Sequence, residues 1–286
     1  MRTVDGLIAR LRSARDFQPQ QYLPMAAGGQ TIGWVRRDHA GRLRAWPGLF
    51  EISGEEIRLR QAKEPELSAS FAQVARALAD DGAIRGWRGE TYAIRAGVSP
   101  SIVFHLERAA TRFFGLNSSA AHLNGFFLQK ENPCIWIARR AATKAIDPGM
   151  LDTLVAGGVP SGEDPRQALL RECGEEAAIP EALAQEARLS SVLRVRRDVP
   201  DGLHSEILHA YDLALPADFK PRNTDGEVSE FLSFDALTLV ERIARGEMTV
   251  EAGLVAADFA LRHGARSDES GEIRAAIDAC RVPTPI

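Results

Sequence analysis

The chain has 286 residues, of which 45% are hydrophobic and 26% are charged, and its formal net charge is −4. This length and composition are typical of a globular protein with one large or two smaller domains. No basic excess indicates nucleic acid as a partner, and no apolar run is long enough to span a bilayer, so we expect no membrane partner.

The N-terminal segment mixes basic and apolar side chains. Its apolar residues recur at helical spacing among four arginines, and they are Val4, Leu7, Ile8 and Leu11. A basic transit helix or a membrane-surface helix would show such a pattern. The same spacing fits an amphipathic helix docked on the protein, which we favour because Asp5 and Asp16 interrupt the basic character.

The first third of the chain predicts a mixture of α and β elements. Thr31–Val35 has the composition of a strand. Leu67–Leu78 predicts a helix with one apolar face, made of Leu67, Phe71, Val74, Ala75 and Leu78. A second helix is predicted over Val103–Phe114. The Gly/Asn/Ser-rich segment Gly115–Ser119 then marks the boundary between an N-terminal α+β domain, residues 1–115, and a second domain, residues 116–286.

The second domain predicts strands interleaved with helices. The predicted strands are His122–Gln129, Cys134–Ala138, Leu154–Val155, Leu189–Val195, Ile207–Leu213 and Val228–Phe234, the first two forming a hairpin around Glu131–Pro133. The predicted helices after them are Leu237–Ile243 and Val250–Leu261. This alternation favours a sheet covered by helices on both faces.

The cysteines give no sign of a metal site or a disulfide framework. Cys134, Cys173 and Cys280 are far apart, and they form no CxxC pair or Cys/His cluster. We therefore expect packed, free thiols and a cytoplasmic protein.

One more helix is predicted in the segment Gly157–Ile179. Asp164 is a suitable N-cap, Pro165 suits the first helical position, and Gln167 completes a capping box. The helix is therefore predicted to begin at Pro165, and Pro180 helps to end it.

This helix gathers three carboxylates on one side. A repeat of 3.6 residues per turn places Glu172, Glu175 and Glu176 together, opposite apolar residues such as Leu169 and Cys173. Like charges at this spacing repel by roughly a few tenths of a kcal/mol per pair, and the helix dipole also disfavours them in the last turns. A Mg²⁺ ion would compensate them, since it binds carboxylates together with phosphate oxygens. Taken alone, three glutamates fit a solvated acidic face better.

The spacing of charged residues over the whole segment favours the metal site over the solvated face, because it resembles the Nudix box at every charged position. Gly157 is followed after five residues by Glu163, after seven more by Arg171 and Glu172, and then by Glu175 and Glu176. In the Nudix hydrolase family this box is a loop–helix–loop whose glutamates hold divalent metals. The resemblance implies an α+β fold in which a Nudix α/β/α sandwich with a mixed sheet follows the smaller N-terminal domain.

The resemblance also implies roles for the box residues. The metal ligands would be Glu172, Glu176 and the backbone of Gly157, Glu175 would be a catalytic residue, and Glu163 and Arg171 would pair to fix the loop on the helix. One position departs from the family, which usually has Gly where this chain has Ala178. A left-handed conformation at Ala178 would cost roughly 1 kcal/mol.

Further motifs resemble a Nudix subgroup related to the domain fused to thiamin pyrophosphokinase in fungi. They are Asp147–Gly162, His122–Gly125, Asp225–Val228 and Asp258–Gly264, with weaker matches at Ile32–Val35 and Leu106–Ala110. The resemblance implies cleavage of thiamin diphosphate, or preferably of its oxo and oxy analogues, to a monophosphate and phosphate. The cofactor would be Mg²⁺, with Mn²⁺ as an alternative ion, and the partner a small-molecule diphosphate. A homodimer is left open, because many Nudix enzymes form one.

Residues outside the box carry weaker signals. Glu227 follows an Asp-Gly pair in a predicted turn, where it is either a further metal ligand or general base, or only the exposed edge of the turn. Arg140 and Lys144 are candidates for gripping substrate phosphates, although a solvated basic loop is the commoner explanation. Asn124 is a candidate for substrate contact, as is the neighbouring His122, for which a structural role is commoner.

Other reaction classes find no support in the sequence. There is no GxSxG elbow, no Cys/His pairing suggested by spacing and no Walker loop. Direct attack of water on a phosphoryl group is the mechanism that remains. Two alternatives stay open: a Nudix hydrolase of another diphosphate, such as a nucleoside diphosphate sugar, and a Nudix-fold binding module without catalysis.

Overall fold

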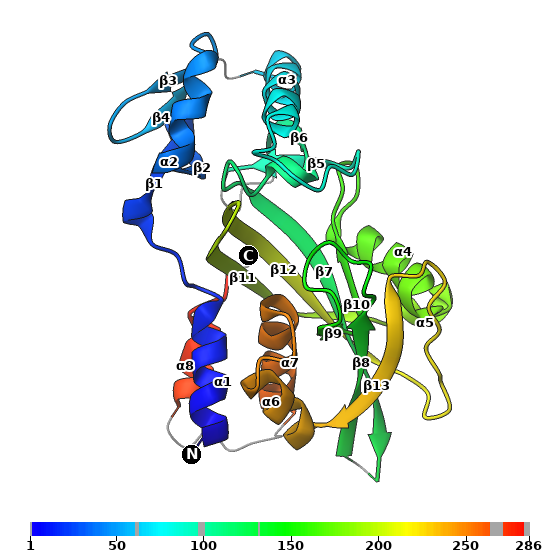
Figure 1. The fold of residues 1–286 in the computed structure, drawn as a ribbon. Helices are drawn as coiled ribbons and strands as arrows, with labels where there is room; N and C mark the ends of the chain where they lie inside the picture. The colour runs from blue at the N-terminus through cyan, green and yellow to red at the C-terminus, as the bar shows by residue number, and fades with distance from the viewer. Residues whose placement is uncertain (1, 61–62, 97–100, 131, 264–270, 283–286) are drawn as a thin grey trace.

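The computed structural model describes residues 2–60, 63–96, 101–130, 132–263 and 271–282, which form two bodies (Figure 1). The N-terminal body contains strands β1 to β6, and the second body contains strands β7 to β13. The predicted turn residue Glu131 and the motif residue Gly264 lie outside the described residues.

The N-terminal body combines two small sheets with one long helix. Its elements are β1 (Tyr22–Ala27), β2 (Gln30–Arg36), α2 (Arg37–Ala40), β3 (Phe50–Ile52), β4 (Ile57–Leu59), α3 (Glu66–Asp80), β5 (Thr91–Arg95) and β6 (Ile102–Glu107), with 3-10 turns at Pro19–Gln21, Gly41–Ala45 and Arg108–Ala110. The first sheet has the order β2-β1-β4-β3, and β5 pairs with β6 separately. All five apolar residues predicted to share a face of α3 are buried, and they pack into the core of this body.

The predicted helix over Val103–Phe114 is wrong. The segment begins as strand β6, which continues into the 3-10 turn Arg108–Ala110. Phe104 and Leu106 are buried, whereas Val103 and His105 are only partly buried. This alternation has the period of two residues that is typical of a strand. The segment at the predicted boundary is also only partly a loop, because β7 begins at Asn117.

The second body is built on a mixed sheet. Its strands are β7 (Asn117–Gln129), β8 (Asn132–Arg140), β9 (Leu151–Thr153), β10 (Val155–Gly158), β11 (Arg188–Val199), β12 (Gly202–Ala214) and β13 (Val228–Asp235). The main order is β11-β12-β7-β8-β13, with β10 added to β7 and β9 to β8. Strands β12 and β7 run parallel, whereas β7 and β8 form the predicted antiparallel hairpin.

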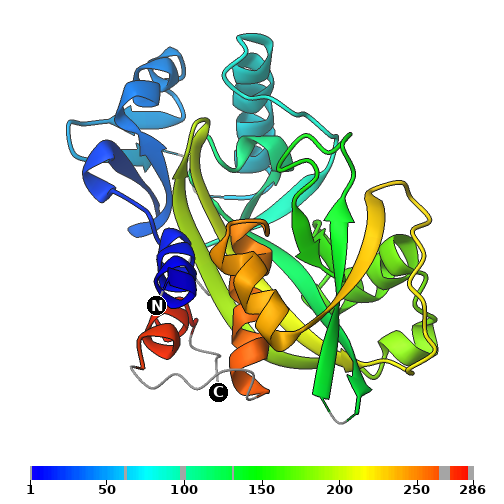
Figure 2. The ribbon, with the colours of Figure 1, turned by 60° about the horizontal axis from the view of Figure 1, so that its bottom comes forward.

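Helices cover both faces of this sheet, as Figures 1 and 2 show. One face carries α4 (Pro165–Ala177) and α5 (Glu181–Ala184), and the other carries α1 (Arg2–Ser13), α6 (Ala236–Ala244), α7 (Val250–Arg262) and α8 (Glu272–Asp278). Side chains of β7 alternate between the two cores: Ala120 faces α7, while Ala121 and Leu123 face α4. The predicted α+β sandwich is therefore confirmed.

Helix α1 belongs to the second body although it starts the chain. Leu7, Ile8 and Leu11 are buried in the core shared with α6, α7 and α8, which confirms the docked helix. Within the described residues, no helix is both long and apolar enough to cross a membrane. Cys134, Cys173 and Cys280 are buried and unbonded to each other.

Candidate active site

Helix α4 starts and ends as its capping residues predict. Asp164 accepts hydrogen bonds from the backbone N–H groups of Arg166 (2.8 Å) and Gln167 (2.9 Å), and the side chain of Gln167 accepts one from the N–H of Asp164 (2.9 Å). At the other end Ala178 is left-handed, with φ 50° and ψ 38°. These two caps place Glu176 in the last turn of α4.

Glu176 is a buried carboxylate, 6% exposed. Its Oε2 accepts a hydrogen bond from the N–H of Ala156 in β10 (2.8 Å). Burial raises the pKa of Glu176 well above its usual range, and the nearby Glu172 carboxylate raises it further, although the bond from Ala156 opposes the shift. A buried carboxylate of this kind gains stability when a cation neutralises it.

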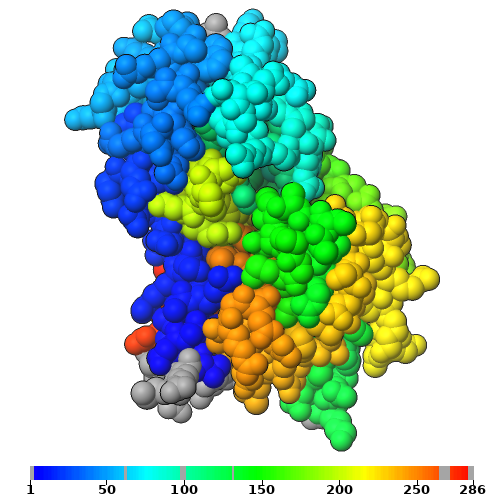
Figure 3. Space-filling model, in the orientation of Figure 1, coloured from blue at the N-terminus to red at the C-terminus, as the bar shows by residue number. Residues whose placement is uncertain are grey.

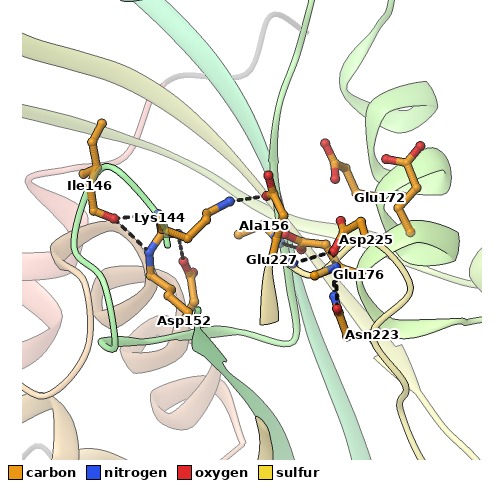
Figure 4. Close-up of polar contacts among 12 residues, drawn as sticks. Lys144, Ile146, Asp152, Ala156, Glu172, Glu176, Asn223, Asp225 and Glu227 are labelled. Carbon is orange, nitrogen blue, oxygen red and sulfur yellow. Dashed lines mark hydrogen bonds and ion pairs between the residues drawn. The ribbon is translucent and has the colours of Figure 1, made fainter. Parts of the chain in front are cut away.

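The loop before β13 brings two more carboxylates to Glu176 (Figure 4). Ligand oxygens of Glu176, Asp225 and Glu227 lie within 4.8 Å of one another. Asp225 Oδ1 accepts hydrogen bonds from the side chain of Asn223 (2.6 Å) and the N–H of Glu227 (2.8 Å). The N–H of Thr224 donates to a carbonyl near the end of α4 (3.0 Å), so the loop and the helix hold the three carboxylates together.

The other two glutamates of helix α4 face Arg171. Its Nη1 donates to Glu172 (2.9 Å) and to Glu175 (3.1 Å). The side chain of Glu172 is 13% exposed and that of Glu175 is 49% exposed, and burial raises the pKa of Glu172. A Cβ built on Gly157 would lie 2.2 Å from Cδ of Glu172, so the glycine leaves the space that this carboxylate occupies.

Arg171 also reaches back to the loop before the helix. Its Nε and Nη2 donate to the two carboxylate oxygens of Glu163, at 3.1 and 3.2 Å. A two-point contact of this kind fixes direction as well as distance. The structure thus brings Glu163 and Arg171 together, and their role in fixing the loop remains a prediction.

The two predicted phosphate-binding cations already contact protein groups. Lys144 forms an ion pair with Glu227 at the carboxylate cluster. Arg140 donates to Asp152 (2.8 Å) and to the carbonyl of Ile146 (2.9 Å). Arg140 therefore holds the 141–150 loop against β9, whereas Lys144 lies beside the carboxylate cluster, and a role of either residue in binding phosphate remains a prediction.

Asn124 is not brought to this site. It is fully buried, and its Nδ2 donates to Asp212 (2.9 Å), whose carboxylate is paired with Arg262 of α7. Its contact with substrate therefore stays a prediction, and the hydrogen bond that the structure shows for it is to Asp212 on the neighbouring strand. His122 does line the cleft, but its Nδ1 is 3.0 Å from the hydroxyl of Thr153.

A cleft leads from the carboxylate cluster to the N-terminal body. It passes the glycines of β10 and continues between residues 85–92, residues 108–112, the 141–150 loop and the β11–β12 turn. Figure 3 shows the hollow between the cyan N-terminal body, the green loop and the yellow-green turn. Its outer part has a volume of about 450 Å³, which suits a small-molecule ligand.

The N-terminal body also contacts the box loop directly. The N–H of Ser161 donates to the carbonyl of Thr91 (2.7 Å), and its hydroxyl is 2.8 Å from Nδ1 of His105. A Cβ built on Gly158 would lie 1.8 Å from the hydroxyl oxygen of Tyr92. The β5–β6 ribbon therefore supports the glycine-rich loop from the side opposite α4.

Sequence reasoning missed two of these residues. From the sequence, Asp225 is placed in a turn and in the motif Asp225–Val228 without a role at the metal site, and the signal that could have found it is its place two residues before Glu227. Tyr92 lies in a segment without any motif, so no local signal marks it.

Comparison with known proteins identifies the family. A model of the NUDIX domain matches residues 122–251, and a domain of unknown function, DUF4743, matches residues 6–118. Nudix hydrolase 20 of Arabidopsis thaliana is 31% identical over 264 residues, which cover 88% of this chain and 71% of the relative. The chain belongs to the Nudix hydrolase family. Nudix hydrolase 24 of the same plant is 32% identical over 255 residues, covering 87% of this chain and 70% of the relative, and both relatives are named as chloroplastic.

Among solved structures, protein DR0079 of Deinococcus radiodurans is 25% identical, with a TM-score of 0.46 over 61% of this chain and 99% of that protein.

As a Nudix hydrolase, the chain is an enzyme that acts on a diphosphate-containing substrate. Nudix hydrolases generally use divalent metals, and the acidic cluster has the chemistry for one.

The donor set of the cluster fits a hard divalent cation. Glu176, Asp225 and Glu227 supply oxygen ligands only, which suits Mg²⁺ or Mn²⁺ rather than a metal that prefers sulfur or nitrogen. The buried position of Glu176 adds to the fit, because its charge needs compensation there.

Proposed function

We propose that this Nudix hydrolase is Mg²⁺-dependent and cleaves thiamin diphosphate or, preferentially, its oxo and oxy analogues, releasing a monophosphate and phosphate. The observation that supports metal-dependent hydrolysis is the cluster of Glu176, Asp225 and Glu227 beside Lys144. The substrate class rests on the motifs outside the box, and the cleft that extends to the N-terminal body offers room for a ring.

Different residues of the site would bind the metal and the substrate phosphate. Glu176, Asp225 and Glu227 would hold the cation, with Glu172 and the backbone of Gly157 close beside them. A bound Mg²⁺ would polarise the phosphoryl group and balance the charge of the leaving group. Lys144 would neutralise a phosphate oxygen when the substrate displaces its contact with Glu227.

A proton acceptor for the attacking water is also needed. We assign this role to Glu227, which is partly exposed and belongs to the cluster, with the exposed Glu175 as the alternative. Glu175 contacts Arg171 on the helix surface, from which it would support Glu172. A base must lie within hydrogen-bond reach of the proton that it removes.

Substrate choice provides the first test. With Mg²⁺, oxo- or oxythiamin diphosphate is expected to be hydrolysed with higher kcat/KM than thiamin diphosphate or ADP-ribose, measured by phosphate or monophosphate release. A site built to hydrogen-bond an oxygen-bearing, uncharged ring discriminates strongly, because the wrong ligand leaves buried polar groups unpaired. If ADP-ribose is preferred tenfold, about 1.4 kcal/mol in transition-state binding, the thiamin assignment fails and only the general hydrolase remains.

Variants of the cluster test the chemistry itself. Glu176→Gln and Asp225→Asn are expected to lower turnover at least about a hundredfold while the melting temperature holds, because removing one charge relieves repulsion without metal. Glu186→Gln, an exposed glutamate outside the site, is the matched control. Full activity in a folded Glu176→Gln protein rules out the metal assignment. Ligand binding without turnover by the unaltered protein, on every substrate, would favour a binding module instead.

A further inference from the structure

We propose that Arg88 and Arg112 of the N-terminal body form an anion subsite that binds a phosphate group of the substrate across the cleft from the box. The inference extends the proposed function, because it assigns part of the diphosphate binding to the domain that lacks the box. It has a binding test of its own that does not depend on hydrolysis.

The two arginines lie where the two parts of the cleft meet. Both line the part that adjoins Gly157 and Gly158, and both also line the outer part near the β11–β12 turn. Arg85 lines only the outer part. A ligand placed at the box loop and extending toward the N-terminal body must therefore pass Arg88 and Arg112.

Most other cations of the cleft are already paired. The pairs are Arg108 with Glu90 (2.9 Å), Arg140 with Asp152 (2.8 Å), Arg197 with Glu251 (3.2 Å) and Lys144 with Glu227. His204 is buried between Glu251 (3.1 Å) and Glu206 (3.5 Å). These groups leave little net charge for a ligand.

Arg88 and Arg112 differ from the paired cations. Among the described residues, the guanidinium of Arg88 has no carboxylate or hydrogen-bond partner, and it is exposed. Arg112 has only a distant contact, 3.9 Å to the half-exposed Asp201. In the part of the cleft that adjoins Gly157 and Gly158, Asp147 is a carboxylate to which the described residues offer no ion pair. The remaining charge is still positive at this end, as binding of a phosphate dianion requires.

The backbone that carries the two arginines is fixed before a ligand arrives. The buried carboxylate of Glu107 accepts hydrogen bonds from the N–H groups of Arg88 (3.1 Å) and Ala109 (3.3 Å), which ties the loop to the 108–112 segment. The carbonyl of Arg112 accepts one from the N–H of Leu203 at the start of β12 (3.0 Å). Binding therefore orders only two side chains, whose planar forks match phosphate oxygens.

Binding of inorganic pyrophosphate in EDTA, measured by calorimetry, tests the subsite without metal. Arg88→Gln and Arg112→Gln are each expected to weaken binding about tenfold, the double variant more, and the affinity of the unaltered protein is expected to fall as salt rises. Arg44→Gln, an exposed arginine of the same body outside the cleft, is the control and should bind normally. Unchanged binding by the double variant, an equal loss in Arg44→Gln, or no binding by the unaltered protein overturns the proposal.

Kinetics with Mg²⁺ separate this proposal from the proposed function. The arginine variants are expected to raise KM for thiamin diphosphate about tenfold, with kcat and the melting temperature nearly unchanged. Glu176→Gln should lose turnover yet keep its pyrophosphate affinity in EDTA. A loss of kcat with unchanged KM in the arginine variants contradicts a binding role. If the unaltered protein hydrolyses neither thiamin diphosphate nor its oxo and oxy analogues, the proposed substrate class fails while the calorimetry still decides the subsite.

Discussion

Ala178 adopts a conformation at the end of α4 that favours glycine. Its φ of 50° and ψ of 38° are left-handed, and the N–H of the following Ile179 donates to the carbonyl of Cys173 (2.9 Å). The reversal buries Ile179 in the core beneath α4. Helix α4 therefore ends with the left-handed residue expected of the Nudix box. Because that residue is alanine, its Cβ makes the conformation less favourable than it would be for glycine.

Ala178→Gly is expected to stabilise the protein by up to about 1 kcal/mol, because glycine reaches this conformation without the steric cost. The gain is net of the larger conformational freedom that glycine has in the unfolded chain. Urea unfolding followed by circular dichroism measures the difference. The matched control is Gly174→Ala in the interior of the same helix, where nothing lies within 4 Å of the added Cβ and alanine is the better helix former. A clear destabilisation by Ala178→Gly contradicts the argument.

At the scale of elements, the glycine-rich loop is held between α4 and the β5–β6 ribbon. Glu172 of α4 packs against Gly157, and Tyr92 of β5 packs against Gly158. Neither glycine has a positive φ, so their smallness rather than their backbone freedom matters. The loop position thus depends on both bodies of the molecule.

Gly158→Ala is expected to lower kcat/KM and to destabilise the protein by about 1–3 kcal/mol, because the new Cβ overlaps the hydroxyl of Tyr92. Tyr92→Phe removes that oxygen, after which the nearest ring atom, Cζ, lies 3.0 Å from the Cβ. The double variant should therefore recover part of both losses. The measurements are kcat/KM and urea unfolding for all four proteins, and additive losses would show that the two residues do not touch.

His204 links three elements of the second body. It lies on β12 between Glu206 of the same strand and Glu251 of α7, and Arg197 of β11 also contacts Glu251. Burial lowers the pKa of His204, but the two carboxylates outweigh it and raise the pKa to about 9. The same contact holds the pKa of Glu206 at about 2 despite its burial.

This network predicts a loss of stability at alkaline pH. Because the folded-state pKa of His204 is raised above the ordinary 6.5, its contribution is complete below about 6.5 and is lost as pH rises through 9. The free energy of unfolding should fall over this window in urea melts at a series of pH values. His204→Gln should be less stable at pH 6 and show a flatter profile. Parallel profiles for the two proteins contradict the assignment.

For the whole molecule, the chain order does not match the two bodies. Helix α1 precedes the N-terminal body but packs between α6, α7 and α8 of the second body. The predicted first domain, residues 1–115, thus includes a helix that packs on the second body. The boundary at residue 115 remains a prediction for the residues after α1. Removing residues 1–115 would remove Leu7, Ile8 and Leu11 from the core of the second body.

Leu11→Ala is expected to destabilise the protein by about 2–5 kcal/mol, as a buried leucine truncation does. Hydrogen exchange should speed up in α6 and α7 more than in α3, although Leu11 lies far from α6 and α7 in sequence. Arg12→Ala on the exposed face of α1 is the control, with an effect within about 0.5 kcal/mol. Equal exchange rates in α6 and α7 for Leu11→Ala and the unaltered protein would contradict the docking.

Much of the fold was predictable because it depends on local periodicity. The apolar faces of α1 and α3, the capping box of α4 and the hairpin of β7 and β8 follow from patterns a few residues long. The segment after Val103 shows the limit, because a short apolar run fits either period and its pairing with β5 decides the outcome. Likewise, helical spacing placed Glu172, Glu175 and Glu176 together without showing which would be buried.

The sequence by itself determined the reaction class, since the residues of the Nudix box lie on one continuous loop and helix whose spacing is local. Only the tertiary structure decided which carboxylates meet. Glu176 joins Asp225 and Glu227 because the loop before β13 packs on the end of α4. The structure also placed the β5–β6 ribbon against the box loop, and it placed Arg88 in the cleft that Gly157 and Gly158 line. Such contacts join segments far apart in the chain, and they depend on how the two bodies pack rather than on any local pattern.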